Sequence, residues 1–165
     1  MPTEKAHGLQ IAKMCEAYAK IGHSVTLVLP KRVNVIKESV SQYYGLTEKF
    51  TVRYLTIPDL IRFSKYVGKI AFWCHGLLFL IRLSWYQTPR EAMIITRSPE
   101  VAWLFKLRGW PVIYEAHGWP YRRQNILLWL LRKVDLIVAN SDGTASEFRK
   151  RNFKAVLVSP NGVDL

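Results

Sequence analysis

Cysteine is scarce in this sequence. Only two of the 165 residues are cysteine, Cys15 and Cys74; they form no Cys-x-x-Cys pair, and no signal-peptide pattern opens the chain. We therefore expect two reduced thiols packed in apolar helical segments rather than a disulfide framework. No histidine or carboxylate stands at ligand spacing from either thiol, so a metal site built on them is not expected.

Acidic residues are half as numerous as basic ones. Twelve Asp and Glu stand against 24 Lys and Arg, a formal net charge of +12. This excess favours anionic partners: nucleic acid, an acidic membrane leaflet or a phosphorylated substrate. The basic residues are scattered, however, with no zinc-finger spacing, no aromatic ribonucleoprotein motif and no recognition helix. A nucleic-acid-binding domain therefore stays an alternative, and no nucleic-acid partner is expected.

No apolar run reaches the length of about 20 residues that a membrane-spanning helix needs. The first long run, residues 70–81, lies between Lys69 and Arg82; a second, residues 126–131, lies between two basic pairs. Leu and Trp between basic flanks are typical of a helix in the membrane interface. They are equally typical of a core helix with basic ends, and both interpretations stay open.

Hydrophobic periodicity switches repeatedly between the strand and helix types. Residues 25–29 lack polar alternation, which is typical of a strand covered on both faces in a parallel sheet. They follow an amphipathic helix whose polar stripe is Gln10, Lys13, Glu16 and Lys20. Further strands are expected at 51–55, 93–96, 112–115, 136–139 and 155–158, and helices at 67–86, 99–108, 122–133 and 142–151. The alternation predicts a doubly wound, Rossmann-like α/β fold with a parallel sheet.

Both ends of the sequence indicate that it is cut short. Residues 1–8 lead into the first helix with no strand before them, although the first strand of a doubly wound domain is central. Residues 159–165 have the composition of a turn that leads onward. We expect residues 1–158 to form one domain and residues 159–165 to begin a linker to an absent second domain. The segment 31–49 is expected to be a loop with a short helix around 36–44.

Three segments carry motifs that occur in order along the chain. They are Lys-Ala-His-Gly-Leu-Gln at 5–10 followed by 21–28, Tyr-Glu-Ala-His-Gly at 114–118, and Pro-Asn-Gly-Val-Asp at 160–164. They resemble, in turn, the opening loop and helix, the strand-end histidine motif and the interdomain segment of glycosyltransferase family 4. The chain is thus similar to the amino-terminal, acceptor-side half of a GT-B enzyme. No segment resembles the paired-glutamate donor motif of the family's second domain.

The resemblance implies a glycosyltransferase of the hexosyl-transferring type. Such an enzyme moves a sugar from a nucleotide-sugar donor to a sugar or lipid-linked acceptor, with retention of the anomeric configuration. It needs no cofactor and no metal, because helix dipoles and basic side chains stabilise the leaving diphosphate. We expect a cytoplasmic location, with possible peripheral association on the inner face of an anionic membrane. This half alone is expected to be inactive.

Candidate site residues fall into two groups. By the resemblance, His117 is the catalytic residue that contacts the transferred sugar, with Gly118 allowing a sharp turn beside it. Gly8, with His7 and Lys5, is expected near the donor diphosphate, where a glycine at a helix start lets backbone amides approach an anion.

Further polar residues end the other predicted strands. Arg97 follows the strand at 93–96 and is expected to hold an anionic acceptor or a phosphate, with a salt bridge as the alternative. Glu115 is interpreted as a structural partner rather than a base. Asn140 and Ser141 end the strand at 136–139, and Ser141 or Asp142 is expected to cap the next helix, so neither Asn140 nor Ser141 is chosen as catalytic.

Two other functions stay open. A nicotinamide-dependent oxidoreductase would need a Gly-x-Gly-x-x-Gly fingerprint after its first strand, and the sequence has none. A non-catalytic subunit or membrane-binding module, paired with a separately encoded donor domain, has the same sequence features as a truncated enzyme.

Overall fold

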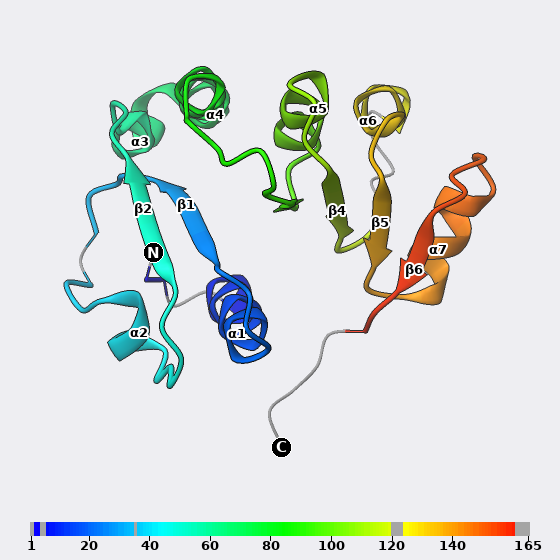
Figure 1. The fold of residues 1–165 in the computed structure, drawn as a ribbon. Helices are drawn as coiled ribbons and strands as arrows, with labels where there is room; N and C mark the ends of the chain where they lie inside the picture. Colours follow the sequence, from blue (N-terminus) through cyan, green and yellow to red (C-terminus); the bar gives the residue numbers. More distant parts are fainter. Residues whose placement is uncertain (1, 4–5, 35, 120–123, 161–165) are drawn as a thin grey trace. The chain divides into compact units, whose positions relative to one another are not determined.

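The computed structural model describes residues 2–3, 6–34, 36–119 and 124–160. The chain divides into two compact units, Met1–Trp85 and Tyr86–Leu165. Both are built from helices and parallel strands in alternation, as the sequence predicts (Figure 1). Each unit is described in turn.

The first unit has a two-stranded parallel sheet, in which Thr26 pairs with Thr51. The strands lie within one residue of their predicted positions. The expectation that residues 25–29 are covered on both faces is wrong for this unit, because β1 is only half-buried. The elements are α1 (Ala6–Lys20), β1 (Thr26–Pro30), α2 (Val40–Tyr43), β2 (Thr51–Leu55), the 3-10 helix η1 (Leu60–Phe63), α3 (Ser64–Val67) and α4 (Lys69–Ser84).

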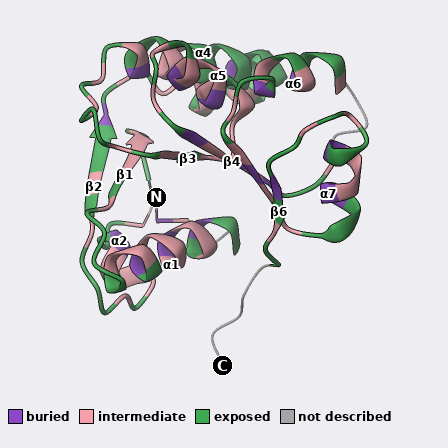
Figure 2. Cartoon of the chain, turned by 45° about the vertical axis from the view of Figure 1, so that its right-hand side comes forward, coloured by how far each residue is buried: buried purple, intermediate pink, exposed green. Residues whose placement is uncertain are grey.

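The second unit has a four-stranded parallel sheet in the order β3-β4-β5-β6. Its core contains Val112, Leu131, Ile137 and Phe148, all almost fully buried. Figure 2 shows buried residues along the strands of this sheet and on the helices that cover it. The elements are β3 (Ile94–Thr96), α5 (Pro99–Leu107), β4 (Val112–Ala116), α6 (Gln124–Leu131), β5 (Leu136–Ala139), α7 (Asp142–Arg149) and β6 (Val156–Val158).

Two serines start the helices that follow β3 and β5. Ser98 accepts a hydrogen bond from the backbone N–H of Val101 at the start of α5, and Ser141 accepts one from Thr144 at the start of α7. A serine in this position satisfies a helix-end amide that has no partner in the helix. The cap predicted at Ser141 or Asp142 is therefore confirmed at Ser141.

The segment 31–49 contains the predicted short helix, although it is shorter than expected. Ser39 and Gln42 form a capping box that starts α2 at Val40. The helix occupies Val40–Tyr43 rather than the expected 36–44.

Glu16 contradicts the predicted polar stripe of the first helix. Its side chain is 4% exposed and accepts hydrogen bonds from the backbone N–H groups of Thr47 and Glu48, at 2.6 and 3.2 Å, and from Lys13 at 3.1 Å. Burial alone would raise the pKa of Glu16, but these hydrogen bonds together lower it to about 2. The buried carboxylate therefore anchors the loop before β2.

The predicted helix at 67–86 is interrupted near its start. Gly68 has a φ of 56°, a conformation that glycine adopts without strain, and it separates α3 from α4. Cys74 on α4 is exposed, so the expectation of two packed thiols is wrong there; Cys15 is half-buried, and neither cysteine is in a disulfide bond. Among the described residues, no helix combines the length and the apolar character needed to cross a membrane.

Candidate functional site

The carboxyl edge of the four-stranded sheet gathers polar side chains from successive strands. Arg97 follows β3, His117 follows β4 and Asn140 follows β5. Because the strands are parallel, their carboxyl ends meet at one edge, where ligands bind in open α/β sheets. The sequence placed these residues at strand ends, and the structure brings them to one edge.

His117 is fixed through its backbone by the neighbouring strand. The side-chain amide of Asn140 donates a hydrogen bond to the carbonyl oxygen of His117 at 3.0 Å. The backbone N–H of Asn140 donates to Ala116 at 3.1 Å, which continues the β4–β5 pairing. The side-chain oxygen of Asn140 is buried and has no hydrogen-bond partner within the described part of the chain. Asn140 thus holds the residue predicted as catalytic, a role that sequence reasoning did not assign to it.

Arg97 and Glu115 form an ion pair that joins the ends of β3 and β4. The Nε of Arg97 donates to a carboxylate oxygen of Glu115 at 2.8 Å, and the side chains are 20% and 13% exposed. The salt bridge considered for Arg97 is therefore present, and Glu115 is a structural partner as predicted. Since the pair is neutral overall, Arg97 adds little net positive charge to this edge.

The imidazole of His117 is exposed, yet its surroundings favour the neutral form. Partial desolvation lowers the pKa of His117, the positive charge of Arg97 lowers it further, and Glu115 opposes both. A neutral imidazole has one nitrogen that donates and one that accepts a hydrogen bond. The neutral form can therefore either donate a hydrogen bond to a hydroxyl group or accept one from it.

Gly118 shows no feature that requires glycine. Its φ is not positive, and a Cβ added there would meet no atom within 4 Å. The backbone bends at His117 and Gly118 as predicted, but without a positive φ the bend does not itself require glycine.

Gly8 lies in the first turn of α1 and is buried. A Cβ at this position would overlap the Thr3 methyl group and lie 2.5 Å from the Tyr44 hydroxyl. That hydroxyl in turn bonds both backbone groups of Thr3, accepting from its N–H at 2.9 Å and donating to its carbonyl at 2.8 Å. Close packing thus accounts for glycine here. The adjacent His7 is exposed, and Lys5 lies outside the described residues.

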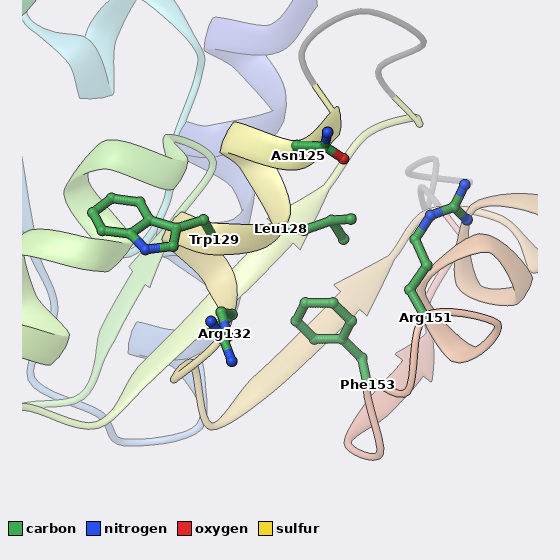
Figure 3. A pocket seen from close by; sticks show the side chains of 6 residues that line it. All are labelled: Asn125, Leu128, Trp129, Arg132, Arg151 and Phe153. Atoms are coloured by element: carbon green, nitrogen blue, oxygen red, sulfur yellow. The ribbon is translucent and has the colours of Figure 1, made fainter.

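An open cavity of about 290 Å³ lies beside α6, and none of the predicted site residues lines it (Figure 3). Arg151 at its rim pairs with Glu147 at 2.7 Å and covers the ring of Trp119 at 4.3 Å. Its lining is Asn125, Leu128, Trp129, Arg132, Arg151 and Phe153. Within the described residues, no group of three or more His, Cys, Asp or Glu side chains is placed to hold a metal ion.

Comparison with protein families gives one match that decides the class of the protein. The model for Glycosyltransferase Family 4 matches residues 8–165, almost the whole chain. The chain belongs to glycosyltransferase family 4. Its parallel strands and intervening helices agree with the Rossmann-like half of a GT-B fold. The comparisons with curated proteins and with solved structures give no match.

Membership of this family makes the chain part of a glycosyltransferase, whose substrates are a nucleotide-sugar donor and an acceptor. The match includes Gly8 and His117 and begins after Lys5 and His7. Gly8 and His117 lie in different units of the family 4 chain. The two groups are therefore treated as separate candidate sites.

Proposed function

We propose that this chain is the acceptor-side half of a retaining hexosyltransferase that uses a nucleotide-sugar donor. In this proposal residues 1–158 form the acceptor domain, and residues 159–165 begin the linker to a donor-binding domain. The observation that carries the proposal is the edge at His117, where Asn140 fixes the backbone and Arg97 with Glu115 sets the charge. Family membership supplies the reaction class.

His117 is the catalytic residue of the proposed reaction. Its neutral imidazole contacts the hydroxyls of the transferred sugar and orients the anomeric carbon towards the acceptor. The acceptor hydroxyl attacks the anomeric carbon, and the bond between that carbon and the diphosphate breaks. The proton of the hydroxyl leaves with the departing phosphate. Orientation and stabilisation of the leaving group supply most of the rate enhancement.

Arg97 acts here as a positioning residue for the acceptor. Because Glu115 neutralises much of its charge, it would orient the acceptor at short range rather than capture an anion at long range. Gly118 leaves the space beside the imidazole open, since it has no side chain and no close neighbour.

On the family resemblance alone, Lys5, His7 and Gly8 are proposed to lie near the donor diphosphate. The exposed His7 side chain and the amino-terminal end of α1 supply a polar and electropositive surface. No metal or other cofactor is part of the proposed mechanism, in which helix dipoles and basic side chains stabilise the leaving group.

The proposed location is the cytoplasm, with peripheral association on the inner face of a membrane. The net charge of +12 supports an anionic surface as partner, and a lipid-linked acceptor would be reached there.

The test is a transfer assay with a panel of nucleotide sugars and acceptors, on this chain and on a version extended at both ends. We expect transfer only by the extended protein, with the anomeric configuration of the product, read by NMR, matching that of the donor. In the extended protein, His117→Ala should lower kcat about 100-fold or more, consistent with loss of a group that acts in the transition state. The matched control is His23→Ala, another exposed histidine.

Two results would contradict the proposal. Equal kcat in the His117→Ala and His23→Ala variants would remove His117 from the active site. No transfer by a well-folded extended protein would favour a non-catalytic subunit that binds a membrane or a separate donor domain.

A further inference from the structure

Helix α4 exposes an apolar stripe within its own unit. Its members follow one another at helical spacings of three, four and four residues, so they share one face of the helix. The stripe consists of Ile70, Trp73, Leu77 and Ile81, with 65, 61, 59 and 46% of their surface exposed. We call these four residues the α4 stripe.

The opposite face of α4 fixes the orientation of the helix. Ala71, His75 and Leu83 are buried, and the Nδ1 of His75 lies 3.3 Å from the carbonyl oxygen of Pro58. The helix thus packs on its unit through this second face. Since α4 packs on its unit through this face, the stripe is not exposed because the helix is detached from the unit.

Aromatic side chains extend the apolar surface at both ends of the helix. Tyr66 on α3 is 85% exposed, and Trp85, immediately after α4, is 76% exposed. Tyrosine and tryptophan combine an apolar ring with a polar group, and they are enriched where lipid tails meet head groups. Contiguous exposed apolar surface of this kind marks an interaction site.

The charges around the stripe have one sign. Between Asp59 and Glu91 the sequence contains no acidic residue. Within the unit of α4 this stretch contains four basic residues, all exposed: Arg62, Lys65, Lys69 and Arg82. Basic side chains at the ends of an apolar helix face are attracted to anionic head groups while their aliphatic parts cover apolar surface.

We propose that the α4 stripe inserts into the interface of an anionic lipid bilayer, with α4 parallel to the membrane surface. The stripe then lies at the boundary of the acyl chains, and Lys69 and Arg82 reach the lipid phosphates from its two ends. This inference rests on one part of the proposed function, the association with a membrane. It assigns that association to one helix face.

The one-signed charge also argues against a second copy of the chain as the occupant. A symmetric pairing of two α4 stripes would bring the basic residues of both copies together without any acidic partner between 59 and 91. Such like-charge contacts oppose association. An anionic bilayer neutralises the same charges.

The first experiment measures co-sedimentation of the whole chain with vesicles of phosphatidylcholine, with and without phosphatidylglycerol. Binding is expected on the anionic vesicles and should weaken with salt. The variant Leu77→Glu should weaken it about tenfold or more, because a buried leucine contributes about one tenfold step in affinity or more. The control is Leu107→Glu on α5, since Leu107 is 58% exposed and Leu77 is 59% exposed.

A second pair of variants tests the charges. Lys69→Gln and Arg82→Gln should each weaken binding to anionic vesicles about fivefold and leave any binding to neutral vesicles unchanged. Lys154→Gln, which removes an exposed lysine from the other unit, should have no comparable effect. Circular dichroism and thermal melting of each variant establish that it is folded.

Cys74 provides a probe on the same helix that needs no new residue. It is exposed on α4, one position after Trp73. In a Cys15→Ser background, anionic vesicles should slow its reaction with a water-soluble maleimide severalfold. Full reactivity of Cys74 in vesicle-bound protein would overturn the inference even if binding occurs.

Three further outcomes would overturn it. They are absence of vesicle binding, equal loss of binding in Leu77→Glu and Leu107→Glu, and a dimer in sedimentation equilibrium that Leu77→Glu dissociates. Vesicle binding requires no donor and no turnover, so an inactive protein that binds vesicles contradicts the proposed function alone. An enzyme that is active on a soluble acceptor but does not bind vesicles contradicts this inference alone.

Discussion

Arg97 donates a hydrogen bond from Nε to Glu115 at 2.8 Å, and this pair ties the ends of two adjacent strands together. Both side chains are largely shielded from water, so removing one partner leaves the other charge poorly solvated. Arg97→Gln should therefore lower the free energy of unfolding by about 2 kcal/mol, measured by urea denaturation. The exposed pair Lys150–Glu147 is the control, and Lys150→Gln should have no measurable effect. Equal stability of wild type and Arg97→Gln would contradict the structural role.

The His117 imidazole should titrate below the ordinary value of about 6.5. Its pKa can be followed by NMR. Arg97→Gln should raise this pKa, because it removes a positive charge, and Glu115→Gln should lower it further. The unfolded chain binds a proton at His117 more readily than the folded chain, so His117 makes folding less favourable as pH falls through and below about 6.5. Unchanged pKa values in both variants would disprove this electrostatic coupling.

In the extended enzyme the same titration predicts a pH dependence of turnover. The neutral form of His117 is the proposed active form, so kcat/KM, which reports the free enzyme, should stay constant as pH falls through 6.5 and decline only at lower pH. Rate profiles of wild type and Arg97→Gln should differ, with the acidic limb of the variant at higher pH. Superimposable profiles would show that another group controls the acidic limb.

Glu16 should stabilise the fold through the loop at Thr47 and Glu48. Glu16→Gln removes the negative charge that these amides and Lys13 bind, and should cost about 2 kcal/mol of unfolding free energy. Because its folded pKa is lowered to about 2, this stabilisation is complete above about pH 4.5 and is lost as pH falls towards 2. The difference in urea midpoint between wild type and Glu16→Gln should shrink over that range. A difference that stays constant down to pH 2 would contradict the charge-based role.

Two helical glycines should respond in opposite ways to alanine. Gly8→Ala forces a methyl group against Thr3 and Tyr44 and should destabilise the protein by about 1 to 3 kcal/mol. Gly76→Ala in α4 meets no atom within 4 Å and should stabilise it by about 0.5 to 1 kcal/mol. Thermal melting of both variants measures the difference. Stabilisation by Gly8→Ala would show that packing does not require glycine there, and donor binding would then be the stronger explanation.

Much of the fold was predictable because parallel strands and their helices leave strong local patterns. Residues 51–55 and 136–139 were predicted as strands at their observed bounds, and 136–139 is a short apolar segment between Asp135 and Asn140. The interruption at Gly68 was missed because a single glycine within a helical pattern does not by itself mark a break; only the backbone conformation reveals it.

The candidate site was only partly predictable. Arg97 and His117 stand out because each directly follows a predicted strand, and parallel pairing brings such positions together. The contacts that these two residues make with Glu115 and Asn140 depend on the register between the strands. The hydrogen bond from Asn140 to the His117 carbonyl joins residues 23 positions apart, which no local motif encodes.

By itself the sequence determined the class of fold, the order of its elements, the family motifs and the excess of positive charge, because these depend on local periodicity and composition. Only the tertiary structure decided which way the polar and apolar side chains face. It buried Glu16 against the loop at Thr47 and exposed Cys74 beside the α4 stripe, although both residues lie on helices that the sequence predicts. The physical reason is that a helical period says which residues share a face, whereas the neighbours that pack on that face come from distant parts of the chain.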